Sequence, residues 1–197
     1  ADVVQWTIRD LRAIASLAAD LGVLVVLENH EDFTGPVLAR ILGEVAHPSV
    51  RALYDYGNSQ MVGEDPLVAL AAMAPYMARV HAKDHVLVHG PNGPVVQGVP
   101  FGSGNLPVAV TTDRLYMSGL RRFCFENVWS YVAPLKCRVD QLPDTACFKF
   151  EDPSRYLVGD SLPPDQAVRE ERVAFEEGVA AFRQMLAERG YEARRGL

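Results

Sequence analysis

Four short apolar segments of the chain each end in a side chain that can bind a metal ion. These residues are Glu28, Asp55, His81 and Glu126, and each follows a run that reads as a buried strand. In parallel α/β folds the functional groups gather at the carboxyl ends of the strands, so we expect the four side chains to converge. Three carboxylates brought together without a cation would repel one another, and a divalent ion removes that conflict.

The predicted donor set consists of carboxylate oxygens and one imidazole nitrogen. Such a set suits hard or borderline divalent ions and leaves coordination positions open for substrate oxygens. We predict one divalent metal ion, Mn²⁺ first, with Mg²⁺, Co²⁺ or Zn²⁺ as alternatives. A single Glu or Asp after a strand is more often a helix cap or a solvated residue, so the prediction rests on four such strands in succession.

The segments around these residues alternate between helix and strand. Helical patterns occur at 5–21, 36–46, 65–76 and 107–119. Strand patterns lie between them at 23–27, 51–54, 78–80 and 121–125. This alternation predicts an α/β fold with parallel strands. Four such units are half of a (β/α)8 barrel, which typically takes ~250 residues. We therefore expect this chain of 197 residues to supply about strands five to eight of a (β/α)8 TIM barrel, plus a C-terminal helical extension.

Two further regions complete the predicted organisation. The Gly- and Pro-rich stretch 90–104 is too long for a routine connection and reads as an active-site loop. Residues 1–132 are expected to form the C-terminal half barrel, and 133–197 an irregular excursion and a final helix packed on the same barrel.

The faces expected to be buried are Ile8, Leu11, Ile14, Leu17, Ala18 and Leu21 in the first helix, and Val168, Val173, Phe175, Val179, Phe182 and Leu186 in the last.

Composition excludes several classes of protein. The net charge of -6 argues against a nucleic-acid partner, because phosphate binding needs a basic surface. No apolar run approaches the ~20 residues needed to span a bilayer, so no membrane partner is expected. The three cysteines form no C-x-x-C pair and are interpreted as reduced, mostly buried thiols of a cytoplasmic protein.

The residues at the strand ends resemble a known family. The motifs that carry the likeness are "LVVLENH" at 24–30, "YDYGN" at 54–58, "APYMARVHAKDH" at 74–85 and "FENVWSY" at 125–131. They look like strands five to eight of the xylose-isomerase-like TIM barrels, the superfamily of sugar isomerases and epimerases. The C-glycoside deglycosidase catalytic subunits form one branch of it. The resemblance covers about residues 5–130.

The resemblance implies roles for particular residues. Glu28, Asp55, His81 and Glu126 would be the metal ligands, and the two glutamates would also be the catalytic acid and base. At the position of a substrate-contacting histidine of the epimerases this chain has Asn58, and at that of an arginine it has Leu87. A standard ketose 3-epimerase is therefore disfavoured. The residues expected to contact substrate instead are His30, Asn58, Lys83 and Trp129, with His85 a further candidate.

Three functions remain open from the sequence. The first is a divalent-metal-dependent isomerase or epimerase that moves a proton of a sugar or sugar-like polyol between carboxylates. The second is a C-glycoside deglycosidase or lyase subunit, and the third a non-catalytic barrel-fragment subunit. Expected partners are a small sugar-like substrate and either a chain or segment supplying the N-terminal half barrel or a homo-oligomer, because a half barrel exposes strand edges.

Overall fold

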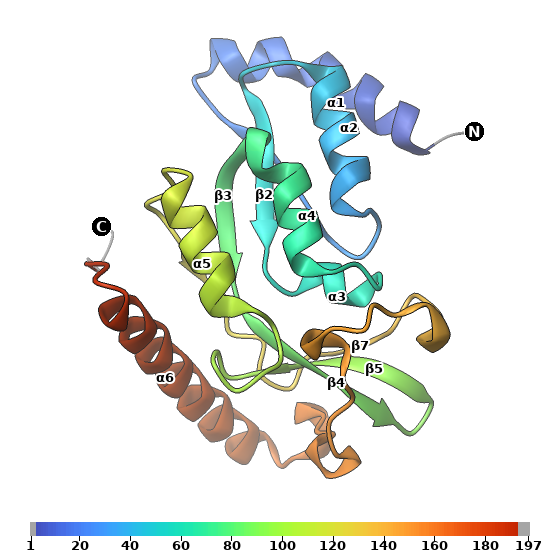
Figure 1. Ribbon diagram of the computed structural model, residues 1–197, viewed down its shortest axis with the longest axis vertical. Coiled ribbons are helices and arrows are strands. Elements are labelled where there is room, and N and C mark those ends of the chain that lie inside the picture. Colours follow the sequence, from blue (N-terminus) through green and yellow to red (C-terminus); the bar gives the residue numbers. More distant parts are fainter. Residues whose placement is uncertain (1–2, 193–197) are drawn as a thin grey trace.

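A four-stranded parallel sheet organises the computed structural model, which describes residues 3–192 (Figure 1). Its strands, in the order β1-β2-β3-β6, are Val25–Glu28, Val50–Asp55, Met77–Ala82 and Cys124–Phe125. Each neighbouring pair is parallel, as predicted from the alternation of helix and strand. Strands β1 and β6 form the two edges of this sheet.

Helices follow the strands and pack against the sheet. They are α1 (Val3–Asp20), α2 (Gly35–Val45), α3 (Asn58–Met61), α4 (Pro66–Met73) with the short 3-10 helix η1 (Ala74–Tyr76), and α5 (Val108–Met117). Asp65 caps α4: its carboxylate accepts a hydrogen bond from the backbone N–H of Leu67 at 2.8 Å, while Pro66 occupies the first turn.

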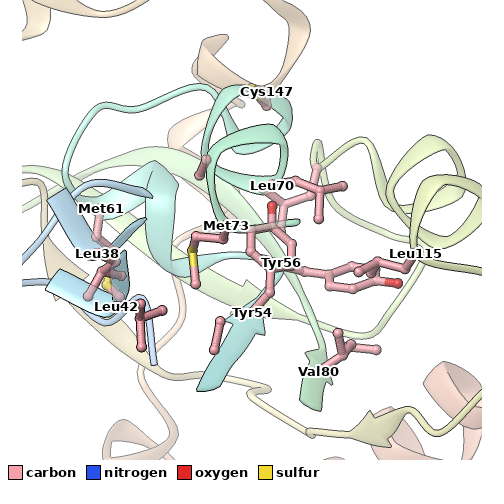
Figure 2. Packing of buried hydrophobic residues seen from close by; sticks show 14 of the residues in the cluster. Leu38, Leu42, Tyr54, Tyr56, Met61, Leu70, Met73, Val80, Leu115 and Cys147 are labelled. Atoms are coloured by element: carbon pink, nitrogen blue, oxygen red, sulfur yellow. The ribbon is translucent and has the colours of Figure 1, made fainter. Parts of the chain in front are cut away.

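The core lies between the sheet and helices α2 and α4. Leu38 and Met73 are fully buried and belong to the same cluster of core side chains as Tyr54 (Figure 2). The Tyr54 hydroxyl donates to the carbonyl of Pro66 at 2.7 Å, and the hydroxyls of Tyr56 and Thr112 are 2.8 Å apart. These two hydrogen bonds satisfy the polar ends of rings that would otherwise be costly to bury.

The stretch 90–104, expected to be an active-site loop, is mainly a β-hairpin, so that expectation is wrong. Strands β4 (Asp84–Gly90) and β5 (Gly93–Val99) pair antiparallel, and β7 (Val132–Pro134) joins them in a second sheet. A two-residue turn connects the hairpin, with Gly93 at φ 120°. Alternate valines of these strands are fully buried, and their burial outweighs the turn-like composition.

The turn after β5 is organised by the buried carboxylate of Asp84. Its oxygens accept hydrogen bonds from the backbone N–H groups of Gly102 and Gly104, both at 3.0 Å, and of Leu106 at 3.3 Å. A Cβ atom on Gly104 would overlap Asp84 Oδ1, so this close approach requires glycine. Asp84 thus ties residues 102–106 to the start of β4.

The C-terminal part contains β7, four 3-10 turns and one long helix. The turns are η2 (Val139–Gln141), η3 (Ala146–Phe148), η4 (Pro153–Arg155) and η5 (Gly159–Ser161), and the helix is α6 (Pro164–Glu188). Helix α6 packs through the ring of Phe182, whose centroid lies 5.0 Å from that of Phe101. That helix lies beside the segment bearing β6. How residues 133–197 divide from 1–132 stays a prediction, and 193–197 lie outside the described residues.

The predicted buried faces of the first and last helices are partly wrong. In α1, Ile8 and Ala18 are buried as expected, but the exposed set includes Ile14, Leu17 and Leu21. In α6 the buried set is Ala174, Gly178, Phe182, Met185 and Leu186, while Val168, Val173 and Phe175 are exposed. Helical periodicity gives the apolar face but not how much of it a neighbour covers, and α1 packs mainly against α2.

All three cysteines are free thiols, and only Cys147 is buried. Among residues 3–192, no helix combines the length and the apolar character needed to cross a membrane.

Candidate metal centre

The parallel sheet brings the predicted donor residues to one edge. Glu28 and Asp55 are the last residues of β1 and β2. His81 lies one residue before the end of β3, directly opposite Asp55 in the strand register. Glu126 follows β6 immediately, and its backbone N–H bonds to the carbonyl of Ala82 in β3.

The imidazole of His81 faces three carboxylates. Its Nδ1 atom lies 3.4 Å from Oε1 of Glu28, 3.9 Å from Oδ2 of Asp55 and 3.8 Å from Oε2 of Glu126. The Nδ1 atom is buried and has no hydrogen-bond partner. A buried nitrogen left unpaired among acceptors costs free energy unless a proton or a cation joins them.

Three of these residues have the spacing of a metal site. Donor atoms of Glu28, Asp55 and His81 all lie within 4.8 Å of one another. Bonds of ~2.0–2.6 Å place two ligand atoms of one ion at most about 5 Å apart. The residues therefore fit a divalent ion. Glu126 is outside this mutually close group, and its role as a fourth ligand stays a prediction.

Backbone N–H groups set the orientation of the Asp55 carboxylate. Its Oδ1 atom accepts from the N–H groups of Gly57 at 2.8 Å and Asn58 at 3.1 Å. This leaves Oδ2 facing His81. The side chain of Asn58, predicted to contact substrate, is itself fully buried and donates from Nδ2 to Oε1 of Glu28 at 3.2 Å. Asn58 therefore orients Glu28, and its Oδ1 atom is buried without a hydrogen-bond partner.

Asn29 links the ends of β1 and β2, a role that the sequence did not indicate. Its Nδ2 atom donates to the carbonyl of Asp55 at 3.0 Å and to the Ser59 hydroxyl at 3.2 Å. Its Oδ1 atom accepts from the backbone N–H of Asp55 at 2.6 Å. Asn29 lies in a run of polar residues, and only the pairing with the neighbouring strand reveals its function.

Lys83 carries a buried positive charge beside the donor residues. Its Nζ atom lies 2.9 Å from Oδ2 of Asp55 and 3.1 Å from Oε2 of Glu126, and the residue is only 5% exposed. Lys83 was expected from the sequence to contact substrate, and the neighbouring Asp84 accepts hydrogen bonds from backbone N–H groups. Lys83 instead compensates the charge of two carboxylates.

The contacts among Lys83, Asp55 and Glu126 shift the pKa values of all three groups. Burial raises the pKa of Asp55 although Lys83 opposes the shift. Burial also acts to raise the pKa of Glu126, but the charge and hydrogen bond of Lys83 outweigh it, so that pKa is lowered. For Lys83 burial acts downward, and the two carboxylates outweigh it and raise its pKa. Glu126 is therefore held as a carboxylate by its lysine neighbour.

The remaining predicted contact residues lie in different settings. His30 is exposed on the loop after β1. Trp129 is half-buried and lines a cavity of about 490 Å³ that begins at Glu126. His85 is fully buried with no hydrogen-bond partner at either ring nitrogen, and burial lowers its pKa to about 3. His85 is thus a neutral imidazole next to Gly57.

Comparison with known proteins identifies the family. Residues 1–143 match the family described as Xylose isomerase-like TIM barrel, and the chain belongs to it. Both the predicted family and the predicted TIM-barrel-like α/β fold are confirmed, with this chain forming part of a barrel. The family match does not confirm the C-glycoside deglycosidase branch.

One curated relative matches most of this chain. The uncharacterized protein YihM of Escherichia coli (strain K12) is 27% identical over 156 residues, which is 77% of this chain and 44% of that protein. This chain therefore spans less than half the length of that curated relative.

Two solved structures share the fold. One is D-psicose 3-epimerase with D-tagatose from Clostridium cellulolyticum H10, with a TM-score of 0.56, 16% identity, 88% of this chain and 54% of that chain. The other is a Xylose isomerase-like TIM barrel protein from Mycobacterium smegmatis in complex with magnesium, with a TM-score of 0.54, 21% identity, 66% of this chain and 45% of that chain.

Proposed function

We propose that the protein is a divalent-metal-dependent isomerase or epimerase that acts on a sugar or sugar-like polyol. The observation that carries this proposal is the cluster of Glu28, Asp55 and His81, whose donor atoms lie within 4.8 Å of one another at the carboxyl ends of adjacent parallel strands. The fold shared with a D-psicose 3-epimerase supports the reaction class, and a relative in complex with magnesium supports a divalent ion.

The proposed mechanism uses two carboxylates as proton acceptor and donor. A bound divalent ion would polarise a substrate oxygen and so acidify the neighbouring C–H bond. Glu28 and Glu126 lie on the two edge strands of the sheet, with His81 between them. One takes the proton from carbon, and the other returns a proton to the opposite face or to the adjacent atom. Lys83 holds Glu126 ionised, the state that a base requires.

Asp55 and Asn58 would position the reacting groups. Asp55 is fixed by two backbone N–H groups, and Asn58 restrains Oε1 of Glu28. Both residues are fully buried, so their geometry is set before substrate binds. Preorganised groups of this kind lower the barrier because they need no rearrangement during the reaction.

A second proposal concerns how the barrel is completed. The edges of β1 and β6 are unpaired within the sheet, and apolar residues in and just after α1, among them Leu17 and Leu21, are exposed. We propose that a further segment or a partner chain completes the barrel there, because unpaired edges and exposed apolar faces favour association. If the protein binds no metal ion, this second proposal describes a non-catalytic subunit of the barrel.

Metal content and proton exchange test the proposed function together. Purified protein should contain one divalent ion per chain by elemental analysis, and the His81→Ala variant should lose it. The matched variant His30→Ala, which removes an exposed histidine outside the donor group, should retain the metal. The wild-type protein with Mn²⁺ should exchange a C–H proton of a ketose such as D-fructose or D-tagatose with solvent deuterium. Equal metal content in both variants would remove His81 from the site and overturn the proposal.

A further inference from the structure

A large open cavity continues from the candidate metal centre along the segment that follows β6. It has a volume of about 490 Å³, and Glu126 belongs both to its wall and to the group of side chains around His81. Ligand sites commonly measure about 300–1,000 Å³. The cavity is therefore large enough for a ring-sized group, and Glu126 links its wall to the side chains around His81.

The wall of this cavity combines aromatic rings with uncharged and acidic polar groups. Trp129 and Tyr131 contribute the rings, and Asn127 and Asp160 contribute hydrogen-bonding groups. A flat ring beside amide and carboxylate groups suits a partner with an apolar face and hydroxyl groups at its edge, because the face packs on the indole while the hydroxyls donate to the acceptors.

The charge of the cavity excludes anionic occupants. Glu126 and Asp160 are acidic, and no residue lining the cavity is a lysine, arginine or histidine. The nearest described cation in the site, Lys83, is already paired with Asp55 and Glu126. A phosphate or carboxylate group placed here would meet like charge without a compensating partner.

The backbone holds this wall in place. The N–H of Gly98 in β5 donates to the carbonyl of Tyr131 at 2.8 Å, and the N–H of Ser130 donates to the carbonyl of Gly98 at 3.2 Å. Ser130 has φ 62°, a left-handed conformation that a non-glycine residue adopts at a cost. On the other side, a Cβ atom on Gly159 would lie 2.6 Å from Ser130 Oγ and 3.7 Å from the Trp129 ring. Gly159 thus lies close to Ser130 and to the edge of the indole.

We infer that the cavity beside Trp129 is a binding subsite for the second ring of a neutral glycoside. The first sugar ring lies at Glu28, Asp55 and His81 and carries the carbonyl group that proton transfer from carbon requires. The second ring is either another sugar or an aryl group, since both present an uncharged face to the indole. The inference rests on the proposed function for the position of the first ring. It extends that function by assigning the substrate to unphosphorylated glycosides larger than a monosaccharide.

Fluorescence of Trp129 provides a direct test. The chain has two tryptophans, and Trp6 lies far from the cavity in sequence and in α1, so the Trp6→Phe variant leaves Trp129 as the single reporter. This variant is titrated with phenyl β-D-glucopyranoside, cellobiose, methyl β-D-glucopyranoside and glucose 6-phosphate, each with and without Mn²⁺. Mn²⁺ binding itself is measured separately by calorimetry.

We expect the phenyl glycoside or cellobiose to bind about tenfold more tightly than the methyl glycoside, a difference typical of one ring stacked on an aromatic side chain. Whichever of the two binds better identifies the second ring as aryl or sugar. These two variants lack the fluorescent reporter, so their glycoside affinities are measured by calorimetric titration. The preference should disappear in Trp129→Ala, with Mn²⁺ binding unchanged, and should largely persist in Trp129→Phe, which keeps a ring. Glucose 6-phosphate should bind no better than the methyl glycoside.

The outcomes separate this inference from the proposed function. Stoichiometric Mn²⁺ binding, together with equal affinities for all the glycosides or an unchanged preference in Trp129→Ala, would overturn the subsite and leave the proposed function standing. Tight binding of glucose 6-phosphate would also overturn it. Absence of Mn²⁺ binding would instead count against the proposed function, and the titrations without Mn²⁺ would still decide whether the cavity prefers a second ring.

Discussion

The ammonium group of Lys83 lies 2.9 Å from Oδ2 of Asp55, the carboxylate oxygen that also faces the imidazole of His81. The same ammonium lies 3.1 Å from Glu126. Lys83 therefore compensates the charge of two of the three site carboxylates, of which Asp55 is fully buried. A divalent ion would supply further positive charge to the three carboxylates beyond that of Lys83.

Removing this charge should destabilise the protein. In Lys83→Met the fully buried carboxylate of Asp55 loses its cationic partner, and we expect a loss of about 3 kcal/mol in the free energy of unfolding. Added Mn²⁺ should raise the melting temperature of this variant more than that of the wild type, because the ion replaces the missing positive charge. Denaturant unfolding with EDTA or with Mn²⁺ measures both effects.

A surface pair provides the control for Lys83. Lys136 lies 3.0 Å from Glu31, and both side chains are more than a quarter exposed. Lys136→Met should therefore cost less than about 1 kcal/mol and should not alter the response to Mn²⁺. Equal losses in the two variants would show that Lys83 acts as an ordinary surface lysine.

Asn29 should influence metal affinity without contacting the metal. Asn29→Ala removes the hydrogen bonds to both backbone groups of Asp55, so we expect a loss of about 1–3 kcal/mol in stability. Because Asp55 is then less restrained, Mn²⁺ affinity should fall by about 10–100-fold. Calorimetric titration measures the affinity. Asn105→Ala, which removes one hydrogen bond to the carbonyl of Lys149, should leave it unchanged.

The candidate donors could be predicted from sequence because each lies at an abrupt change from apolar to polar residues. That change marks the carboxyl end of a buried parallel strand, and the fold itself then brings such ends together. Glu28, Asp55 and His81 converge as the pattern predicted. The residues that orient them could not be found in this way, since Asn29 and Lys83 act through partners on neighbouring strands.

The hairpin and the partly exposed helices show where the pattern failed. Residues 90–104 are rich in Gly and Pro, yet buried valines before and within this stretch, among them Val88 and Val96, form paired strands. Sequence composition records the turn but not the partner that β4 finds in β5. For α1, exposure of Leu17 depends on which element lies beside the β1 edge, and local periodicity carries no such information.

Gly98 should be required for the wall of the cavity. A Cβ atom at this position would overlap the carbonyl oxygen of Val128, which is backbone and cannot rotate away. We expect Gly98→Ala to cost about 1–3 kcal/mol through overpacking and to abolish the fluorescence response of Trp129 to glycosides. Gly119→Ala, where φ is 98° and no heavy atom lies within 4 Å, should cost about 1 kcal/mol from backbone strain alone. It should leave that response intact.

Asp84 should give the protein a specific pH dependence. Burial raises its pKa from 3.8 to about 6, although the N–H groups of Gly104, Gly102 and Leu106 oppose the shift. A carboxyl group whose pKa is higher in the folded than in the unfolded state binds more protons when folded. Its contribution to stability is therefore complete below pH ~4 and is lost as the pH rises through 6. A shift of about two units corresponds to roughly 3 kcal/mol.

The Asp84→Asn variant isolates this contribution because it has no titrating group at the same position. Between pH 4 and pH 7 the wild type should lose about 3 kcal/mol of unfolding free energy relative to the variant. Urea unfolding of both proteins at several pH values measures the difference, and titrations common to both, including that of Asp55, cancel in it. Parallel stability curves would mean that the N–H groups of residues 102–106 stabilise the ionised carboxylate fully. The carboxylate of Asp84 would then hold residues 102–106 equally well from pH 4 to pH 7.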